Sequence, residues 1–209
     1  MLQRVSFPVA GTQVEAILHL PDGETIGGVA VLPGRGGTKE DTTYLCDALA
    51  AAGVAGLRFT FRIEGDAFAG LADTGGAVRL LRAHPSIPQR VAVLGWSFGG
   101  AVAAMAAGRD SRIRAAVLIS TPAAREYFGD AKPLAEISRT RAKVLIVRPA
   151  ADEVVPPGDA DRYAGVLTQA RVRHELVTID GADHNFTRPA QRAEMLAAVT
   201  GWLRETLAA

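Results

Sequence analysis

The sequence predicts a three-layer α/β/α sandwich built on a mostly parallel, mixed β-sheet. From residue 27 onward, short apolar runs alternate with helix-like segments, which is the pattern of parallel strands joined by helices. Several runs are apolar throughout, as expected for strands that helices cover on both faces. Residues 2–20 instead form two partly alternating segments around a Gly-containing turn, which predicts antiparallel strands at one edge of the sheet.

Element boundaries follow from composition and from turn signals. Strands are expected, in chain order, at residues 2–9, 12–20, 27–33, 54–61, 90–96, 113–120, 142–149 and 171–179. Helices are expected between them at residues 39–53, 73–85, 97–108, 157–170 and 188–207. The whole chain, residues 1–209, is expected to form one domain, because its length suits a single core and no linker interrupts it.

Each expected helix carries its own signal. The first has early acidic residues and Gly53 after its end, and the second has Asp73 at its N-cap and ends before Pro85. The third is rich in small residues, the fourth has acidic residues in its first turn, and the last is amphipathic. The longest irregular stretch, Thr121–Arg141, is too short for a second domain and predicts a small cap or a flap.

Composition argues against several classes of protein. The chain is 48% apolar and 22% charged, which is typical of a globular protein. Its formal net charge is +1 with scattered basic residues, so nucleic-acid binding is not expected. We expect a cytoplasmic protein, because the N-terminus lacks the apolar core of a signal peptide and no run approaches a membrane span. The one cysteine, Cys46, permits no internal disulfide and is expected to be a buried structural thiol.

The motif GWSFG, residues 95–99, places a serine between two glycines where a strand gives way to a helix. A tight turn there strains the backbone of Ser97 and lifts its hydroxyl above the edge of the sheet where α/β proteins bind ligands. Gly95 and Gly99 stand where a side chain would collide with the adjoining helix or strand. The alternative is a helix-capping serine beside glycines that only permit close packing. The apolar strand and alanine-rich helix around the motif favour a catalytic nucleophile.

A serine nucleophile needs a histidine base, which a carboxylate usually orients. His184 follows the last strand in a loop that reaches the same sheet edge as Ser97. Asp152 follows the preceding strand at this edge and is the expected acid, with Glu153 as its competitor. The other histidines are expected to be structural: His19, His84 and His174. Helix dipoles and turn formation explain the remaining nearby acids: Asp159, Asp161, Asp180 and Asp183.

Four motifs together resemble the α/β-hydrolase superfamily, each following a predicted strand: PGRGG (33–37), GWSFGG (95–100), AADEVVP (150–156) and GADHNF (181–186). Within it the chain is similar to the small, cap-less hydrolases of the dienelactone-hydrolase kind. The resemblance implies an α/β-hydrolase fold, a Ser97–Asp152–His184 triad with Gly95 and Gly99 at the nucleophile elbow, and no metal or organic cofactor. Matched by position, the backbone N–H groups of Arg35 and Phe98 would form the oxyanion hole.

We therefore expect a serine hydrolase that cleaves small carboxylic esters or thioesters through an acyl-enzyme. The alternatives are a non-catalytic ligand- or partner-binding protein of this fold, and peptidase or acyltransferase chemistry on the same triad.

The chain departs from the family pattern at two places: Pro33 replaces a frequent family histidine, and RIEGDAF (62–68) differs from the family's RGxGxS. Substrate class, oligomeric state and any ligand contact of Arg62 or Glu64 therefore stay open. The short Thr121–Arg141 segment predicts an open site for short acyl groups, and the Arg35 side chain is interpreted as a solvated loop arginine rather than a carboxylate-binding group.

Overall fold

The computed structural model describes residues 1–123 and 128–209. In this part of the chain an eight-stranded sheet has the order β1-β2-β4-β3-β5-β6-β7-β8. β1 (Leu2–Val9) pairs antiparallel with β2 (Thr12–His19), and β2 pairs antiparallel with β4 (Ala55–Phe59). The other strands run parallel to β4: β3 (Gly28–Leu32), β5 (Val91–Trp96), β6 (Ile113–Ile119), β7 (Lys143–Pro149) and β8 (His174–Ile179). The predicted mixed, mostly parallel sheet is confirmed.

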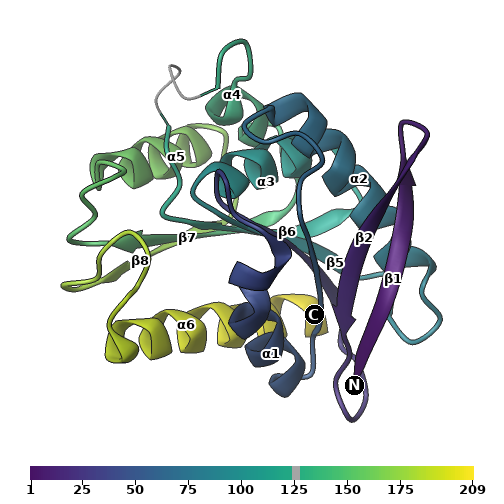
Figure 1. The fold of residues 1–209 in the computed structure, drawn as a ribbon. Helices are drawn as coiled ribbons and strands as arrows, with labels where there is room; N and C mark the ends of the chain where they lie inside the picture. The colour runs from purple at the N-terminus through teal and green to yellow at the C-terminus, as the bar shows by residue number, and fades with distance from the viewer. Residues whose placement is uncertain (124–127) are drawn as a thin grey trace.

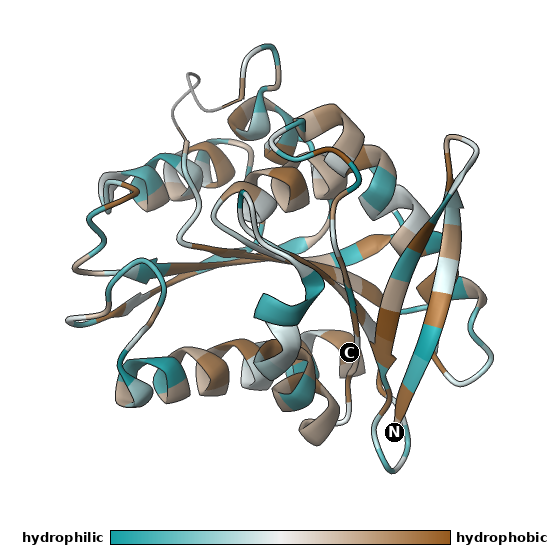
Figure 2. Ribbon diagram, in the orientation of Figure 1, coloured by the Kyte–Doolittle hydropathy of each residue, from teal (hydrophilic) through white to brown (hydrophobic). Residues whose placement is uncertain are grey.

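Helices cover both faces of the sheet (Figure 1). One layer consists of α2 (Ala67–Ala83), α3 (Phe98–Arg109), α4 (Pro133–Ile137) and α5 (Gly158–Gln169). The other layer consists of α1 (Thr43–Ala51), which follows the 3₁₀ turn η1 (Lys39–Thr42), and α6 (Pro189–Ala208). The central strands β3, β5, β6 and β7 contribute to two apolar cores, one on each face, and Figure 2 shows the sheet as mostly hydrophobic along these strands. In β3, for example, Ala30 and Leu32 belong to one core, and Val29 and Val31 belong to the other. The three-layer prediction is thus confirmed.

The start of α2 corrects the sequence-based prediction. The helix begins at Ala67, and its N-cap is Asp66, whose side chain accepts hydrogen bonds from the Phe68 and Ala69 N–H groups. The prediction that Asp73 caps this helix is wrong, because Asp73 lies in the middle of α2 and is buried. The Gly pair that follows Asp73 is typical of a turn, but here the second glycine allows close packing. A Cβ atom on Gly76 would come within 2.6 Å of the Phe7 ring.

The segment Thr121–Arg141 lies partly outside the described residues, and Tyr127 is one of the residues not described. Its described part includes α4, which packs closely on α3. A Cβ atom on Gly108 of α3 would come within 2.0 Å of the Glu136 carbonyl oxygen. Phe128 is buried at the edge of the same core. The described part of this segment therefore extends the helical layer above the sheet.

Candidate active site

Ser97 occupies the single residue between β5 and α3, with a φ of +52° and a ψ of −118°. A non-glycine residue with positive φ is strained, and such strain is often found at functional sites. The turn is possible because its neighbours lack side chains. A Cβ atom on Gly95 would lie 2.0 Å from the Gly99 carbonyl oxygen, and one on Gly99 would lie 2.4 Å from the Pro33 carbonyl oxygen. Ser97 is the N-cap of α3, and the structure describes this helix along its whole length. The Ser97 side chain nevertheless forms no capping hydrogen bond.

His184 and Asp152 form a buried pair above the ends of β7 and β8. The Nδ1 atom of His184 lies 2.8 Å from Oδ2 of Asp152, and the two side chains are 11% and 1% exposed. Because a carboxylate oxygen accepts this hydrogen bond, the neutral form of the imidazole carries its proton on Nδ1 and has its lone pair on Nε2. The other oxygen, Oδ1, accepts the backbone N–H groups of Val154 and Val155 at 2.8 Å each. Asp152 is thereby held in one orientation, and it orients His184.

The loop that carries His184 is fixed by contacts from other elements. The hydroxyl of Ser120, which follows β6, donates to the His184 carbonyl oxygen at 3.0 Å. Asp183 accepts hydrogen bonds from the backbone N–H groups of Asn185 and Thr187, as its expected role in a turn requires. The Phe186 ring packs edge-on against the ring of Trp96, the residue before Ser97. Sequence reasoning missed Ser120, because its partner lies far along the chain.

The loop after β3 approaches the serine turn from the neighbouring strand. A Cβ atom on Gly34 would lie 3.7 Å from the Ser97 Cβ, so the peptide that joins Gly34 to Arg35 passes beside the serine. Phe98 is the first residue of α3, and the N–H of such a residue has no partner within its own helix. The chain therefore brings the two sequence-predicted backbone donors, on Arg35 and Phe98, to the same region as Ser97.

A pocket of about 640 Å³ opens around these groups. Ser97 and His184 both line it, together with Arg35 and Phe98. A volume of this size suits a small-molecule site. Sequence reasoning had not assigned most of its remaining wall, which comes from several elements: Pro33, Gly34, Gly37, Asp41, Thr42, Tyr44, Trp96, Pro122, Phe128, Val154, Val155, Asn185 and Arg192.

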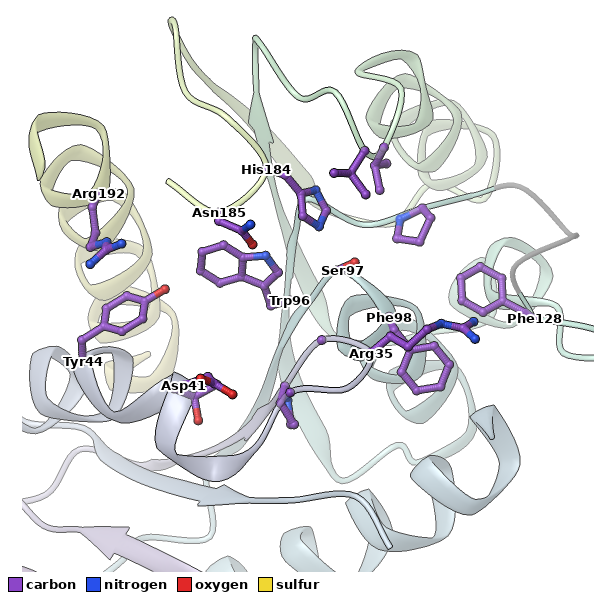
Figure 3. Close-up of a pocket in the computed structure, with 17 residues that line it drawn as sticks. Arg35, Asp41, Tyr44, Trp96, Ser97, Phe98, Phe128, His184, Asn185 and Arg192 are labelled. Atoms are coloured by element: carbon purple, nitrogen blue, oxygen red, sulfur yellow. The ribbon is translucent and has the colours of Figure 1, made fainter. Parts of the chain in front are cut away.

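The pocket has two chemically different sides, as Figure 3 shows. Phe98, Phe128 and Arg35 lie on one side of Ser97, where the Arg35 guanidinium carbon is 5.4 Å from the centre of the Phe98 ring. Polar groups from η1, α1, the loop after β8 and α6 lie on the other: Asp41, Tyr44, Asn185 and Arg192. The Arg192 guanidinium stacks 5.1 Å from the Tyr44 ring, and burial raises the pKa of the Tyr44 hydroxyl. Tyr44 therefore stays protonated at neutral pH and can donate a hydrogen bond.

Several other candidates from the sequence lie elsewhere. Glu153 is exposed, and the carboxylate bonded to His184 belongs to Asp152. The helix dipole alone does not account for Asp159, which is buried and accepts the Ala123 N–H at 2.7 Å. Arg62 forms an ion pair with a buried carboxylate of α2 rather than extending into the pocket.

Two further groups behave as the sequence predicts. Cys46 is fully buried, and burial raises the pKa of its thiol. His19 is buried in a structural network, where Nδ1 lies 2.9 Å from Asp47 and Nε2 accepts a hydrogen bond from Arg58. Within residues 1–123 and 128–209, no cluster of three or more His, Cys, Asp or Glu side chains is arranged to hold a metal ion. None of the helices in these ranges has the length and apolar character needed to cross a membrane.

The sheet order, the strained serine turn and the histidine–carboxylate pair at the ends of β7 and β8 define an α/β-hydrolase. Residues 63–207 match the sequence profile of the dienelactone hydrolase family. Because this match spans more than half of the chain, the protein belongs to the dienelactone hydrolase family, and so to a family of hydrolases. A search of curated proteins gave no match.

Solved structures of similar fold include several hydrolases. Dienelactone hydrolase from Anabaena variabilis aligns with a TM-score of 0.83 and 20% identity over 99% of this chain and 98% of that chain. Est1E from Butyrivibrio proteoclasticus, with ferulic acid bound, aligns with a TM-score of 0.83 and 19% identity over 98% and 100%. DcsB in complex with its substrate analogue aligns with a TM-score of 0.89 and 15% identity over the full length of both chains. The TM-scores demonstrate a shared fold, and identities this low demonstrate nothing beyond it.

Proposed function

We propose that this protein is a serine hydrolase that cleaves small carboxylic esters or thioesters through an acyl-enzyme. The observation that carries the proposal is the buried His184–Asp152 pair, with Nδ1 and Oδ2 2.8 Å apart, beside a strained Ser97 that lines the same pocket. The family match supports the hydrolase class. A fold can host many functions, so the assignment rests on the site rather than on the fold.

In the proposed reaction, Ser97 Oγ attacks the acyl carbon while His184 Nε2 takes the hydroxyl proton. His184 can accept this proton because Asp152 holds the Nδ1 proton and stabilises the imidazolium cation that forms. The imidazolium then protonates the leaving oxygen or sulfur, and the C–O or C–S bond breaks. Water, deprotonated by the same nitrogen, attacks the acyl-enzyme and releases the acid and Ser97.

The tetrahedral intermediates of both steps carry a negative charge on the former carbonyl oxygen. The backbone N–H groups of Arg35 and Phe98 are proposed to bind this oxygen. Such donors act strongly because they are fixed before the charge develops, and loss of one typically costs about 10²- to 10³-fold in kcat. The positive end of α3, which starts directly after Ser97, adds to this stabilisation.

The pocket favours a small substrate. Its volume of about 640 Å³ is within the range of sites for drug-sized molecules. The Phe98 and Phe128 side can accept an apolar group, whereas the side with Tyr44 and Asn185 offers hydrogen-bonding groups. We therefore infer a preference for short or modest acyl groups over long lipid chains.

The direct test is turnover of a panel of esters and thioesters with acyl groups of increasing length and different charge. Wild-type protein should hydrolyse short acyl esters, and Ser97→Ala should lose this turnover. The matched control is Ser111→Ala, because Ser111 is an exposed serine in the turn before β6 and should leave rates unchanged. Wild-type turnover by Ser97→Ala would disprove the assignment.

A further inference from the structure

Asp73 is a buried carboxylate that the proposed reaction does not use. It lies in the middle of α2 with its side chain 0% exposed. Its Oδ1 accepts a hydrogen bond from Arg62 Nε at 2.5 Å, and its Oδ2 accepts one from the Arg62 backbone N–H at 2.9 Å. Because a carboxylate is costly to remove from water, its partners inside a protein are usually well defined. One buried side chain therefore fixes both the backbone and the guanidinium of Arg62.

The residues around Arg62, here called the 61–65 segment, lie against the loop that follows β3. The Arg35 guanidinium packs on Gly65, where a Cβ atom would come within 3.1 Å of Nη1. The Glu64 carboxylate packs on Gly36, where a Cβ atom would come within 3.3 Å of Oε1. The 61–65 segment therefore contacts the loop of the first proposed oxyanion donor.

The same segment also contacts the second proposed donor. The Phe61 ring meets the Phe98 ring edge-on, with centroids 5.9 Å apart and planes at 89°. The Arg35 guanidinium also lies over the Phe98 ring, 5.4 Å from its centre, and Figure 3 shows these two side chains together. The 61–65 segment thus touches the side chains of both residues whose backbone N–H groups are proposed to bind the oxyanion.

We propose that Asp73 is a positioning residue for the oxyanion hole. By fixing Arg62, it holds the 61–65 segment against Arg35 and Phe98 and so sets the positions of their N–H groups relative to Ser97. This inference rests on the proposed function, since it assigns a support to the same site. Oxyanion donors must be placed accurately to be effective, and small displacements from remote changes lower the rate strongly.

The test compares Asp73→Asn with wild type on an oxygen ester and on its thionoester, in which C=S replaces C=O. Asparagine can accept only one of the two Arg62 hydrogen bonds, because its NH₂ group faces the other N–H. Sulfur is a weak hydrogen-bond acceptor, so thionoester turnover depends less on the backbone donors. For the oxygen ester, kcat should fall about 10- to 100-fold while KM stays within about twofold. The ratio of kcat for the oxygen ester to kcat for the thionoester should therefore also fall.

A matched control is Asp110→Asn. Asp110 accepts the Arg112 backbone N–H at 3.0 Å and its guanidinium at 2.8 and 2.7 Å, so it holds an arginine in the same way, from a half-buried position at the far end of α3. This control should leave both rates unchanged. Arg62→Lys serves as a second variant if Asp73→Asn does not fold, because it keeps the backbone N–H and the positive charge. It should shift the ratio in the same direction.

Three outcomes would overturn the role of Asp73: an unchanged kcat for the oxygen ester, an equal loss on both esters, or an Asp110→Asn effect as large as that of Asp73→Asn. An equal loss would indicate a general structural role. Failure of the proposed function looks different, since Ser97→Ala would then retain turnover. If Ser97→Ala is inactive and the ester ratio of Asp73→Asn is unchanged, only the positioning role is wrong.

Discussion

Replacing Asp152 by asparagine is expected to reverse the tautomer of His184 while leaving its loop in place. Oδ1 of Asp152 accepts two backbone N–H groups, from Val154 and Val155, at 2.8 Å each. The asparagine oxygen should stay with these donors, because an NH₂ group in that place would face two N–H groups. The NH₂ group then faces His184 Nδ1, which the carboxylate oxygen Oδ2 contacts at 2.8 Å in the wild type.

The consequence for catalysis follows from this geometry. An amide NH₂ group only donates, so His184 Nδ1 must accept and the proton moves to Nε2. Nε2 can then no longer take the proton of Ser97. In the Ser-His-Asp proteases, such a reversal lowers kcat by about 10⁴-fold, which corresponds to about 5.4 kcal/mol of transition-state stabilisation. Folding should lose only about 1–2 kcal/mol, because one charged hydrogen bond becomes a neutral one.

The assay is the initial rate of p-nitrophenyl acetate hydrolysis by wild type, Asp152→Asn and Glu153→Gln. Glu153 is the exposed neighbour and so provides a control for loss of a carboxylate in the same loop. The first variant should lose about four orders of magnitude in kcat, and the second should match wild type. If Asp152→Asn keeps more than about a tenth of wild-type kcat, or if Glu153→Gln has the larger effect, the tautomer argument is refuted.

Two further predictions concern the serine turn and the edge of the sheet. Gly95→Ala should destabilise the fold by about 1–3 kcal/mol in urea denaturation and lower kcat, because the new Cβ would meet the backbone of Gly99 at 2.0 Å. Gly165→Ala, with open space on an exposed face of α5, should not destabilise it, and equal effects would count against the steric argument. Burial and Arg58 lower the pKa of His19 below 6.5, so wild type should lose stability from about pH 6.5 downward, as the unfolded state takes up a proton. His19→Gln should lose less over this range, and identical pH profiles would contradict it.

The sequence was sufficient for the sheet and for placing the residues of the proposed triad at one edge of it. Apolar runs separated by helical patterns predict parallel strands, and the C-terminal ends of such strands meet at one edge. Residues in the turns and loops that follow strands, such as Ser97, Asp152 and His184, are therefore placed near one another by strand order alone. The roles proposed for these three residues follow from their chain order, because nucleophile, acid and base in that order are typical of α/β-hydrolases.

Side chains with distant partners could not be predicted in this way. The hydroxyl of Ser120 bonds to the carbonyl of a residue 64 positions away, and Asp159 bonds to a backbone N–H 36 positions away. Local rules gave Asp159 a helix-dipole role and gave Asp73 a capping role, since both roles suit an acid near a helix start. Only the folded chain shows that Asp73 is buried and holds Arg62. The polar side of the pocket could not be predicted either, because Tyr44 and Arg192 come from helices that are far apart in sequence.

In the proposed reaction, Ser97 carries the acyl group during turnover. The most direct measurement is the mass of the protein after rapid mixing with p-nitrophenyl acetate and acid quenching, followed by peptide mapping of any adduct. We expect one added acetyl group on the peptide that contains Ser97, and no adduct in Ser97→Ala. Ester hydrolysis without an adduct, or an acetyl group that maps to another side chain such as His184, would contradict it.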